Sequence, residues 1–382
     1  MSAPTLREVA LPLAQDEIAT LLTNALAAYG FVDARWHISK ADPLPEELLH
    51  AARLHSMTAE ELMLHQVLGA GGVPMVSASN EWHALMRLRE LLDGLPASEE
   101  AVDQALERLC SAGNTQATVA ASTEADTMVL HRCHAIGGGS VPLVRLADDG
   151  FDGRGLVSTR SLAAGEAVVA VPAVALLSVR AAWRSELARV LHVVDEGVWT
   201  EHVIVILLLL HERRRGAHSR WAAWIDTLPA SMHNLSAWSA AEAAALDGCS
   251  AYWRAQANQE ELVQIREELL PRLRAVDAAL FPDDTHASLA AWVWARSVIE
   301  TRAMALPSDL DGAAAGSLVL APCIDFANHA EAAETHLRVH GDALCLCTVC
   351  SVGEGVPLRL SCARTRGQTK RCARSCPRAA LD

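Results

Sequence analysis

Apolar residues in the first third of the chain recur three and four positions apart, which is the period of an amphipathic helix. This spacing predicts one helix within residues 14–29 and another that begins at residues 80–81. Residues 58–61 have the form of a capping box, and the acidic first turn at residues 98–100 predicts a fourth helix, as the helix dipole favours. We therefore expect residues 1–135 to be all-helical.

The hydrophobic pattern changes after this first third. A Gly-Gly-Gly-Ser stretch at residues 137–140 has the composition of a flexible linker. Beyond it, residues 166–171 form a β-rich run that follows a glycine turn and is closed by Pro172. Helical spacing returns at about residues 181–300, and short strand patterns follow it. The expected fold class is therefore α+β, with strands on both sides of a helical insertion.

The longest apolar run has eight residues, at positions 203–210 between two histidines. A helix that spans a bilayer needs about 20 apolar residues, so this run predicts a buried helix and no membrane partner. The first residues lack the basic region and apolar stretch of a secretory signal. We expect a cytoplasmic or nuclear protein whose ten cysteines are thiols, with the plastid left open as an alternative.

Composition narrows the classes of function. The chain has 382 residues, enough for about two domains, and its 51% hydrophobic and 20% charged residues describe an ordinary globular protein. Its formal net charge is −14, which argues against binding that depends on neutralising phosphate groups. We therefore expect no nucleic-acid partner.

Two short motifs have residues suited to a ligand with polar and charged groups. Asp152, Gly153 and Arg154 form a turn in which the glycine lets the backbone approach a ligand closely. Arg302 lies near the end of an apolar helical pattern at residues 290–304. Taken alone, the first motif is also compatible with an ordinary turn between strands. The second is also compatible with a surface arginine at a helix C-terminus.

A third motif follows, in which Asp325, Asn328 and His329 end an apolar segment that starts at residue 318. An Asn-His pair at the end of a strand is also compatible with a structural role. In this order along the chain, the three motifs resemble the SET-domain methyltransferases, specifically the branch of the Rubisco large-subunit lysine methyltransferase. The resemblance covers most of residues 5–360.

The resemblance implies a SET β-fold with a helical insertion. It also implies methyl transfer from S-adenosyl-L-methionine to a lysine side chain of a protein substrate. By position, the backbones of Asp152 and Arg154, with Gly153 between them, would contact the methionine part of this cofactor, and Arg302 its carboxylate.

The resemblance implies a role for the third motif as well. The segment with Asp325, Asn328 and His329 would bind the cofactor's adenine and amino group. In the family, this segment is threaded by the C-terminal strand.

The N-terminal helical part carries a second resemblance. Residues 42–49 and 52–54, followed by Asn80 and Glu81 ahead of a leucine-rich helix, look like the substrate-binding domain of the same branch. In that branch the domain follows the SET domain, whereas here it precedes one. This order would result if two adjacent family members had been joined and the first had lost its SET part.

The C-terminal end departs from the SET pattern. Residues 353–355 resemble the glycine–glutamate turn that leads, in the family, to a tyrosine closing the lysine channel, but Cys362 stands at the tyrosine's position. A thiol does not reproduce the length or the hydrogen bond of a phenol, so we assign no catalytic residue. The implied parts are a substrate-binding-like domain at 1–135, a SET domain at 136–362 with its insertion at about 181–300, and a divergent basic tail at 363–382.

Three alternatives stay open. The missing tyrosine and the reversed domain order fit an inactive SET-like module that binds a protein partner. The branch also includes a histidine methyltransferase, so the acceptor residue is not fixed. A zinc site is suggested by six cysteines near the C-terminus, at positions 345, 347, 350, 362, 372 and 376. The first of these alternate within an expected strand and no second C-x-x-C pair follows, so we expect core positions and no metal.

Overall fold

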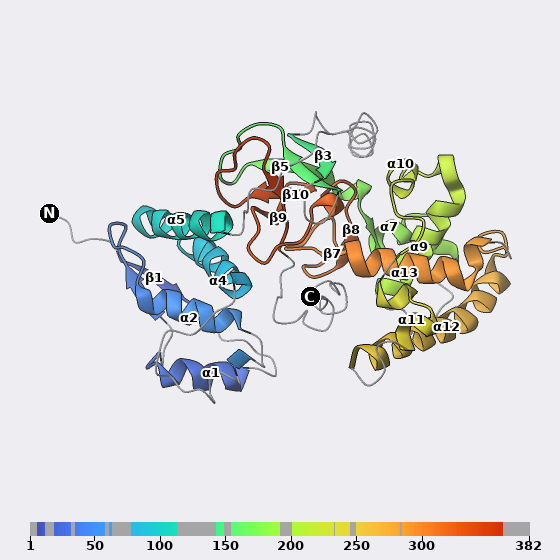
Figure 1. The fold of residues 1–382 in the computed structure, drawn as a ribbon, viewed down its shortest axis with the longest axis horizontal. Coiled ribbons are helices and arrows are strands. Elements are labelled where there is room, and N and C mark those ends of the chain that lie inside the picture. The colour runs from blue at the N-terminus through green and yellow to red at the C-terminus, as the bar shows by residue number, and fades with distance from the viewer. Residues whose placement is uncertain are drawn as a thin grey trace.

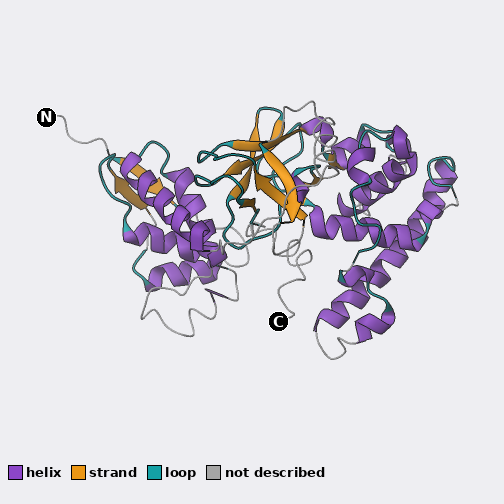
Figure 2. Ribbon diagram, turned by 45° about the horizontal axis from the view of Figure 1, so that its top comes forward, coloured by secondary structure: helices purple, strands orange, loops and turns teal. Residues whose placement is uncertain are grey.

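The computed structural model describes residues 6–11, 19–31, 35–57, 61–62, 78–112, 143–148, 154–191, 201–232, 234–244, 250–282 and 285–361. The predicted linker, most of the capping box, Asp152, Gly153, Cys362 and the C-terminal tail lie outside these residues. Figure 1 shows three parts side by side: N-terminal helices, short strands in the middle, and a larger group of helices beyond them. The second view, in Figure 2, separates the two helical groups in the same way, with the strands between them.

The N-terminal part combines helices with a small sheet. Its helices are α1 (Ala19–Ala28), α2 (Glu46–Ser56), α4 (Ala78–Leu91) and α5 (Pro96–Ala112). Strand β1 (Arg7–Ala10) pairs antiparallel with β2 (Arg35–Ile38), so the prediction that this part is all-helical is wrong. Burial in these strands follows the two-residue period of a strand: Val9 and Ile38 are buried, and their neighbours within each strand are not. Four residues are too few for this period to stand out among helical patterns.

The helices predicted at residues 80 and 98 are present, and each starts two residues earlier than expected. The second of them begins at Pro96, where a proline fits because the first N–H groups of a helix have no partner within it. Between α2 and α4, the Arg53 guanidinium pairs with Glu81, with 2.5 Å between Nε and Oε2. Both side chains are about one-fifth exposed, so this ion pair lies partly within the helix interface.

The middle of the molecule is built from three small sheets whose strand pairings are all antiparallel. In the order of pairing, they are β11 (Pro357–Leu358), β4 (Arg154–Ser158) and β3 (Val144–Asp148); β5 (Ala167–Pro172), β10 (Ala343–Thr348) and β9 (Thr335–His340); and β6 (Leu177–Ser178), β8 (Leu318–Leu320) and β7 (Met304–Ala305). The strand predicted before Pro172 is thus confirmed as β5. Cys345 and Cys347 are buried positions of β10, as expected.

Helices dominate the region between β6 and β7. They are α7 (Val179–Trp183), α8 (Ala188–Leu191), α9 (Glu201–Arg215), α10 (Ala222–Ile225), α11 (Ala240–Ala244), α12 (Ser250–Val276) and α13 (Leu289–Arg302). The apolar run at 203–210 lies in α9 and is buried throughout, which confirms the predicted buried helix. None of the described helices combines the length and apolar character that crossing a membrane requires.

Helix α13 ends two residues before the predicted end. Ala303 is extended, with φ −74° and ψ 145°, and Met304 belongs to β7, where it pairs with Val319 of β8. The sequence did not reveal this end because the apolar pattern continues from the helix into the strand. The early end places Arg302 on the last turn of the helix, next to the segment that follows β8.

Residues 359–361, the last ones described, lie between the Asn-His segment at 328–330 and the start of β9. The Leu360 N–H donates to the Asn328 carbonyl at 2.8 Å, and the Ala330 N–H donates to the Leu360 carbonyl at 3.3 Å. On its other side, the Thr335 N–H donates to the Arg359 carbonyl at 3.2 Å. These parallel bridges hold residues 359–361 against the Asn-His segment, where the sequence resemblance placed a C-terminal strand.

The N-terminal helices contact the middle of the molecule near this same segment. The Trp82 indole N–H of α4 donates to the Ala333 carbonyl at 3.0 Å, and the Cys110 thiol of α5 donates to the same carbonyl at 3.4 Å. Arg89 donates to the Val349 carbonyl at 2.7 Å. The hydrophobic core of the N-terminal part therefore extends onto residues of the β-rich part.

Candidate functional site

The candidate site is built around a short 3-10 helix, η5 (Ile324–Phe326), that follows β8. Cys323, just before it, has φ 74° and ψ −45°, a conformation that residues other than glycine rarely adopt. Backbone in such a region persists only with support from its surroundings, and it is concentrated at functional sites. The segment after this turn buries the Asp325 side chain completely.

The Asp325 carboxylate is held by donors from two other helices. Arg302, on the last turn of α13, places Nη1 2.9 Å from Oδ2 and 3.3 Å from the Asp325 carbonyl oxygen. Trp224 of α10 donates its indole N–H to the same Oδ2 at 3.1 Å. The other carboxylate oxygen, Oδ1, is buried and has no hydrogen-bond partner among the described residues. One acceptor therefore remains for a donor that these residues do not supply.

Burial dominates the electrostatics of this carboxylate. Loss of solvent raises the pKa of Asp325 above its ordinary value of 3.8, while the positive charges of Arg302 and Arg154 and the Trp224 hydrogen bond act to lower it. A buried carboxylate depends on such partners, because an unpaired charge in the interior is costly. The position of the Asp325 carboxylate therefore depends on its hydrogen bonds with Arg302 and Trp224.

Arg154 approaches the same segment from β4. Its guanidinium lies 5.2 Å from the centre of the Phe326 ring, and Nη2 donates to the Thr227 carbonyl at 3.3 Å. These contacts connect the first residue of β4 with η5 and with the residues after α10. Two arginines that are far apart in sequence, Arg154 and Arg302, therefore flank one buried carboxylate.

Asn328 and His329 follow η5 directly. Asn328 is half-buried and His329 is exposed, so the pair is not part of the core. The backbone of Asn328 is fixed by its bond from Leu360, which leaves the pair at the border between η5 and the C-terminal segment. Of the residues predicted from the sequence, the structure brings together Arg154, Arg302 and Asp325, with the Asn-His pair next in the chain.

Two residues of the site were missed from the sequence. Trp224 falls within the predicted helical insertion at about 181–300 but was not identified as a site residue, although a fully buried indole needs a partner for its N–H, and that partner is Asp325. Cys323 gave no signal at all, because a positive φ at a residue other than glycine is not visible in a sequence. Both act on Asp325, the first by a hydrogen bond and the second through the path of the backbone.

This arrangement suits a ligand that carries both an anionic group and a hydrogen-bond donor. Among the described residues only Nη1 of Arg302 is engaged, which leaves its other N–H groups for an anion such as a carboxylate. The open Oδ1 of Asp325 accepts from a donor. Within the described part of the chain, no group of three His, Cys, Asp or Glu side chains is placed to hold a metal ion.

Comparison with known proteins shows the fold. No protein-family profile and no curated protein matches the chain. Among solved structures, it is similar to the SET domain of LSMT bound to lysine and AdoHcy, with 21% identity, a TM-score of 0.53, and coverage of 63% of this chain and 54% of that one. Rubisco LSMT bound to sinefungin and monomethyllysine gives 21% identity, a TM-score of 0.53, and coverage of 64% and 53%.

A third structure, Rubisco LSMT bound to AdoMet, is 21% identical with a TM-score of 0.52, and the match covers 64% of this chain and 54% of that one. The chain therefore spans about half the length of the structures that it matches. Over the matched part it has the fold of a SET domain, which confirms that part of the prediction. The identity of the N-terminal domain and the domain boundaries stay predictions.

Proposed function

We propose that this protein is a SET-type protein-lysine N-methyltransferase that uses S-adenosyl-L-methionine. The observation that carries the proposal is the buried pair of Arg302 and Asp325, which has one open acceptor and unused guanidinium N–H groups. The fold supports it, because the similar structures hold AdoMet, AdoHcy or sinefungin, and two of them also hold lysine or monomethyllysine.

The residues of the site fit this cofactor. The Arg302 guanidinium would bind its carboxylate, and Oδ1 of Asp325 would accept from one of its N–H or O–H groups. Asn328 and His329 would bind the adenine and the amino group, as the sequence resemblance implies. The backbones of Asp152 and Arg154 would complete the site from the other side.

When bound, the cofactor supplies a methyl group on a positively charged sulfur, which an amine displaces in line. The chain contributes alignment, since holding donor and acceptor in the reacting geometry supplies much of the rate. The acceptor lysine must lose its proton, because its ordinary pKa of about 10.4 leaves it protonated and unreactive. Removing the ammonium from solvent lowers that pKa, so a narrow, dry channel would favour the neutral amine.

One observation favours a second candidate function, an inactive module that binds a protein partner. The chain has two tyrosines, and their described contacts lie in other parts of the molecule. Tyr29 packs against His50 in the N-terminal part, with ring centres 4.2 Å apart, and the Tyr252 hydroxyl accepts from Gln256 within α12. The phenol that orients the amine in the family therefore has no equivalent among these residues.

Methylation of a proteome extract tests the proposal. The purified chain is incubated with the extract and S-adenosyl-L-methionine carrying a labelled methyl group, alongside Arg302→Met and the control Arg189→Met, an exposed arginine of α8. We expect labelled proteins with the wild type and the control and none with Arg302→Met, and mass spectrometry then identifies the methylated residue. No label from a wild-type protein that binds the cofactor would favour the inactive module, and label on histidine would replace lysine as the acceptor.

A further inference from the structure

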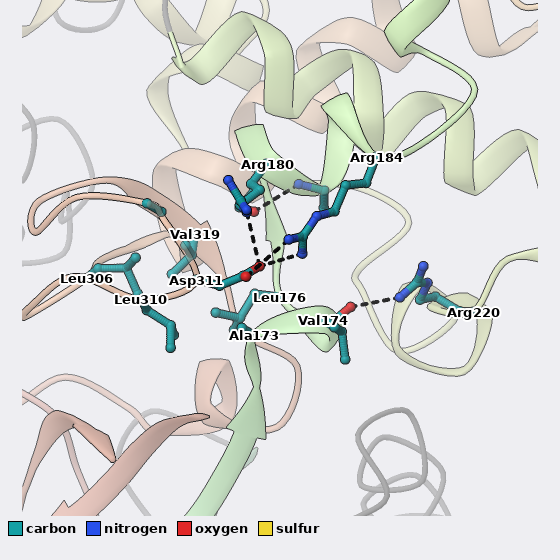
Figure 3. Close-up of a pocket in the computed structure, with 13 residues that line it drawn as sticks. Ala173, Val174, Leu176, Arg180, Arg184, Arg220, Leu306, Leu310, Asp311 and Val319 are labelled. Carbon is teal, nitrogen blue, oxygen red and sulfur yellow. Dashed lines mark hydrogen bonds and ion pairs between the residues drawn. The ribbon is translucent and has the colours of Figure 1, made fainter. Parts of the chain in front are cut away.

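A second group of charged residues lies away from the Asp325 site. A cavity of about 80 Å³ is formed where the turn between β5 and β6, helix α7 and the loop between β7 and β8 meet. Figure 3 shows Arg180 and Arg184 converging on Asp311 in this cavity, with Arg220 on the far side of Val174. None of these residues was singled out by the sequence.

Positive charge exceeds negative charge in the cavity. Asp311 accepts from Nε of Arg180 at 3.2 Å and from Nη2 of Arg184 at 3.1 Å, so one carboxylate serves two arginines. Arg220 donates to the Val174 carbonyl at 2.8 Å and stacks on the neighbouring Trp221 ring. No carboxylate among the described residues pairs with Arg220. The lining thus carries a net charge of about +2 in a chain whose formal charge is −14.

The loop that carries Asp311 is shaped for this arrangement. Asp311 has φ 50°, in the left-handed region that aspartate tolerates better than most residues. Gly312, with φ 77°, lies so close to Arg180 that an added Cβ would be 2.9 Å from its Nη1. The turn is closed by two backbone hydrogen bonds of 2.9 Å between Leu310 and Ala313. The two arginines are therefore held at the cavity by a defined turn.

Apolar groups are exposed beside these charges. Val174 lines the cavity and is 56% exposed, and Trp183, on α7 between the two arginines, is 38% exposed. Tryptophan and arginine are the residues most enriched at the energetic centres of protein interfaces. Of Val174 and Trp183, only Val174 lines the cavity, and a bound peptide would cover its apolar surface, whereas a small ion would leave it exposed.

We propose that this cavity is a docking site for an acidic segment of a protein partner, which inserts one Asp or Glu side chain among the arginines. Its volume admits the end of one side chain and is well below the roughly 300 Å³ of a cofactor-sized pocket. The charge excess favours an acidic residue, and the exposed apolar surface of Val174 at the cavity favours a peptide over a free anion. The site is separate from the Asp325 site, so the inference stands whether or not the protein transfers methyl groups.

Fluorescence anisotropy tests the docking site with a labelled peptide of alternating Glu and small residues, compared with the same peptide carrying Gln for Glu. We expect the acidic peptide to bind about tenfold more tightly, a difference of about 1.4 kcal/mol, because its carboxylate adds charge-assisted hydrogen bonds that the amide cannot make. The preference should shrink as salt is raised, because added ions screen a partly exposed charge. Equal binding of the two peptides, or no binding of either, would overturn the proposal.

Variants locate the binding. Arg220→Gln keeps a polar side chain and removes the charge, and it should weaken the acidic peptide about tenfold. Asp311→Asn keeps a residue that tolerates positive φ and removes the competing carboxylate, so it should tighten binding. Arg189→Gln is the matched control, an arginine of α8 that is 62% exposed and lies outside the cavity, and it should change nothing.

Each variant is first checked for the thermal midpoint of the wild type, and Arg184→Gln replaces Arg220→Gln if that variant is less stable. Weakening by Arg189→Gln as large as by the cavity variant would show non-specific attraction and overturn the proposal. Inorganic phosphate that binds as tightly as the peptide, measured by its competition, would show a small-anion site and overturn the choice of a protein partner.

Discussion

Two arginine–aspartate clusters in this chain use the same residue types in opposite environments. Asp325 has no exposed side-chain surface, and its partner Arg302 is 20% exposed. Asp311 is 31% exposed, and its partners Arg180 and Arg184 are nearly half exposed. Burial raises the pKa of Asp325, whereas hydrogen bonds from Arg184 lead the interactions that lower the pKa of Asp311.

The difference shows what each cluster is suited to do. A buried carboxylate is tied to its partners, because removing one of them leaves an unpaired charge in the interior. Such a pair is rigid and can position a ligand. In the exposed cluster, water can replace an ion-pair partner with little loss of free energy. A carboxylate from another protein can therefore compete for its arginines. The first cluster therefore fits a cofactor site, and the second fits a reversible docking site.

The largest expected effect is that of Arg302→Met, which keeps an unbranched side chain and removes its charge. Asp325 is then left buried with the Trp224 hydrogen bond alone, so we expect a loss of about 3–5 kcal/mol in the free energy of unfolding. Urea denaturation measures it. A loss no larger than that of an exposed arginine would show that the Asp325 carboxylate is not held by this pair.

Trp224→Phe should have a smaller effect. It keeps an aromatic ring in the core and removes the N–H that donates to Oδ2 of Asp325, so we expect a loss of about 1–2 kcal/mol. The same urea experiment measures this, with Trp221→Phe as the matched control, since that indole donates to a backbone carbonyl away from the site. The two variants should differ in how their losses depend on pH, because the Trp224 N–H donates to a carboxylate and the Trp221 N–H donates to a backbone carbonyl.

The pH dependence of stability should differ in sign between the two aspartates. The pKa of Asp325 is raised on folding, so its contribution to stability is complete below pH 3.8 and is lost as pH rises through the folded value. The pKa of Asp311 is lowered, so its contribution is present above pH 3.8 and is lost as pH falls through the folded value.

Unfolding of Asp325→Asn and Asp311→Asn, each compared with the wild type on both sides of pH 3.8, checks these signs. As pH rises, the wild type should lose stability relative to Asp325→Asn and gain it relative to Asp311→Asn. If both stability differences changed with pH in the same direction, burial would not be the dominant influence on the pKa of Asp325.

The smallest effect is expected for Arg184→Met. Asp311 keeps its hydrogen bond from Arg180 and its access to water, so the thermal midpoint should stay within the error of the measurement. Differential scanning fluorimetry of this variant beside Arg302→Met gives the comparison directly. A midpoint lowered as far as that of Arg302→Met would mean that the Asp311 cluster is as tightly coupled to the fold as the buried one.

The sequence predicted the parts of the molecule whose patterns are long. The eight-residue apolar run of α9 and the strand before Pro172 are each visible within one short window, and each of the three motifs is as well. The sequence did not predict β1 and β2, which have four residues each, or the end of α13, where one apolar pattern runs from helix into strand. For these elements, long-range pairing decides the structure.

The candidate site was predicted only in part for the same reason. Arg302, Asp325 and Arg154 were found through motifs, but their meeting at one carboxylate depends on three separate elements. The role of Trp224, the positive φ of Cys323 and the Asp311 turn are consequences of packing that no local pattern records. Residues were therefore easier to predict than the contacts between them.

Calorimetric titration with S-adenosyl-L-methionine tests the central claim most directly, using the wild type, Asn328→Ala and the control Arg184→Met. Asn328 is half-buried and lies outside both ion-pair clusters, so its substitution should leave the fold intact, as circular dichroism can verify. We predict saturable binding by the wild type and the control, and loss of binding by Asn328→Ala. A folded wild-type protein that releases no heat at any temperature tested, or an Asn328→Ala variant that binds as the wild type does, would contradict the account.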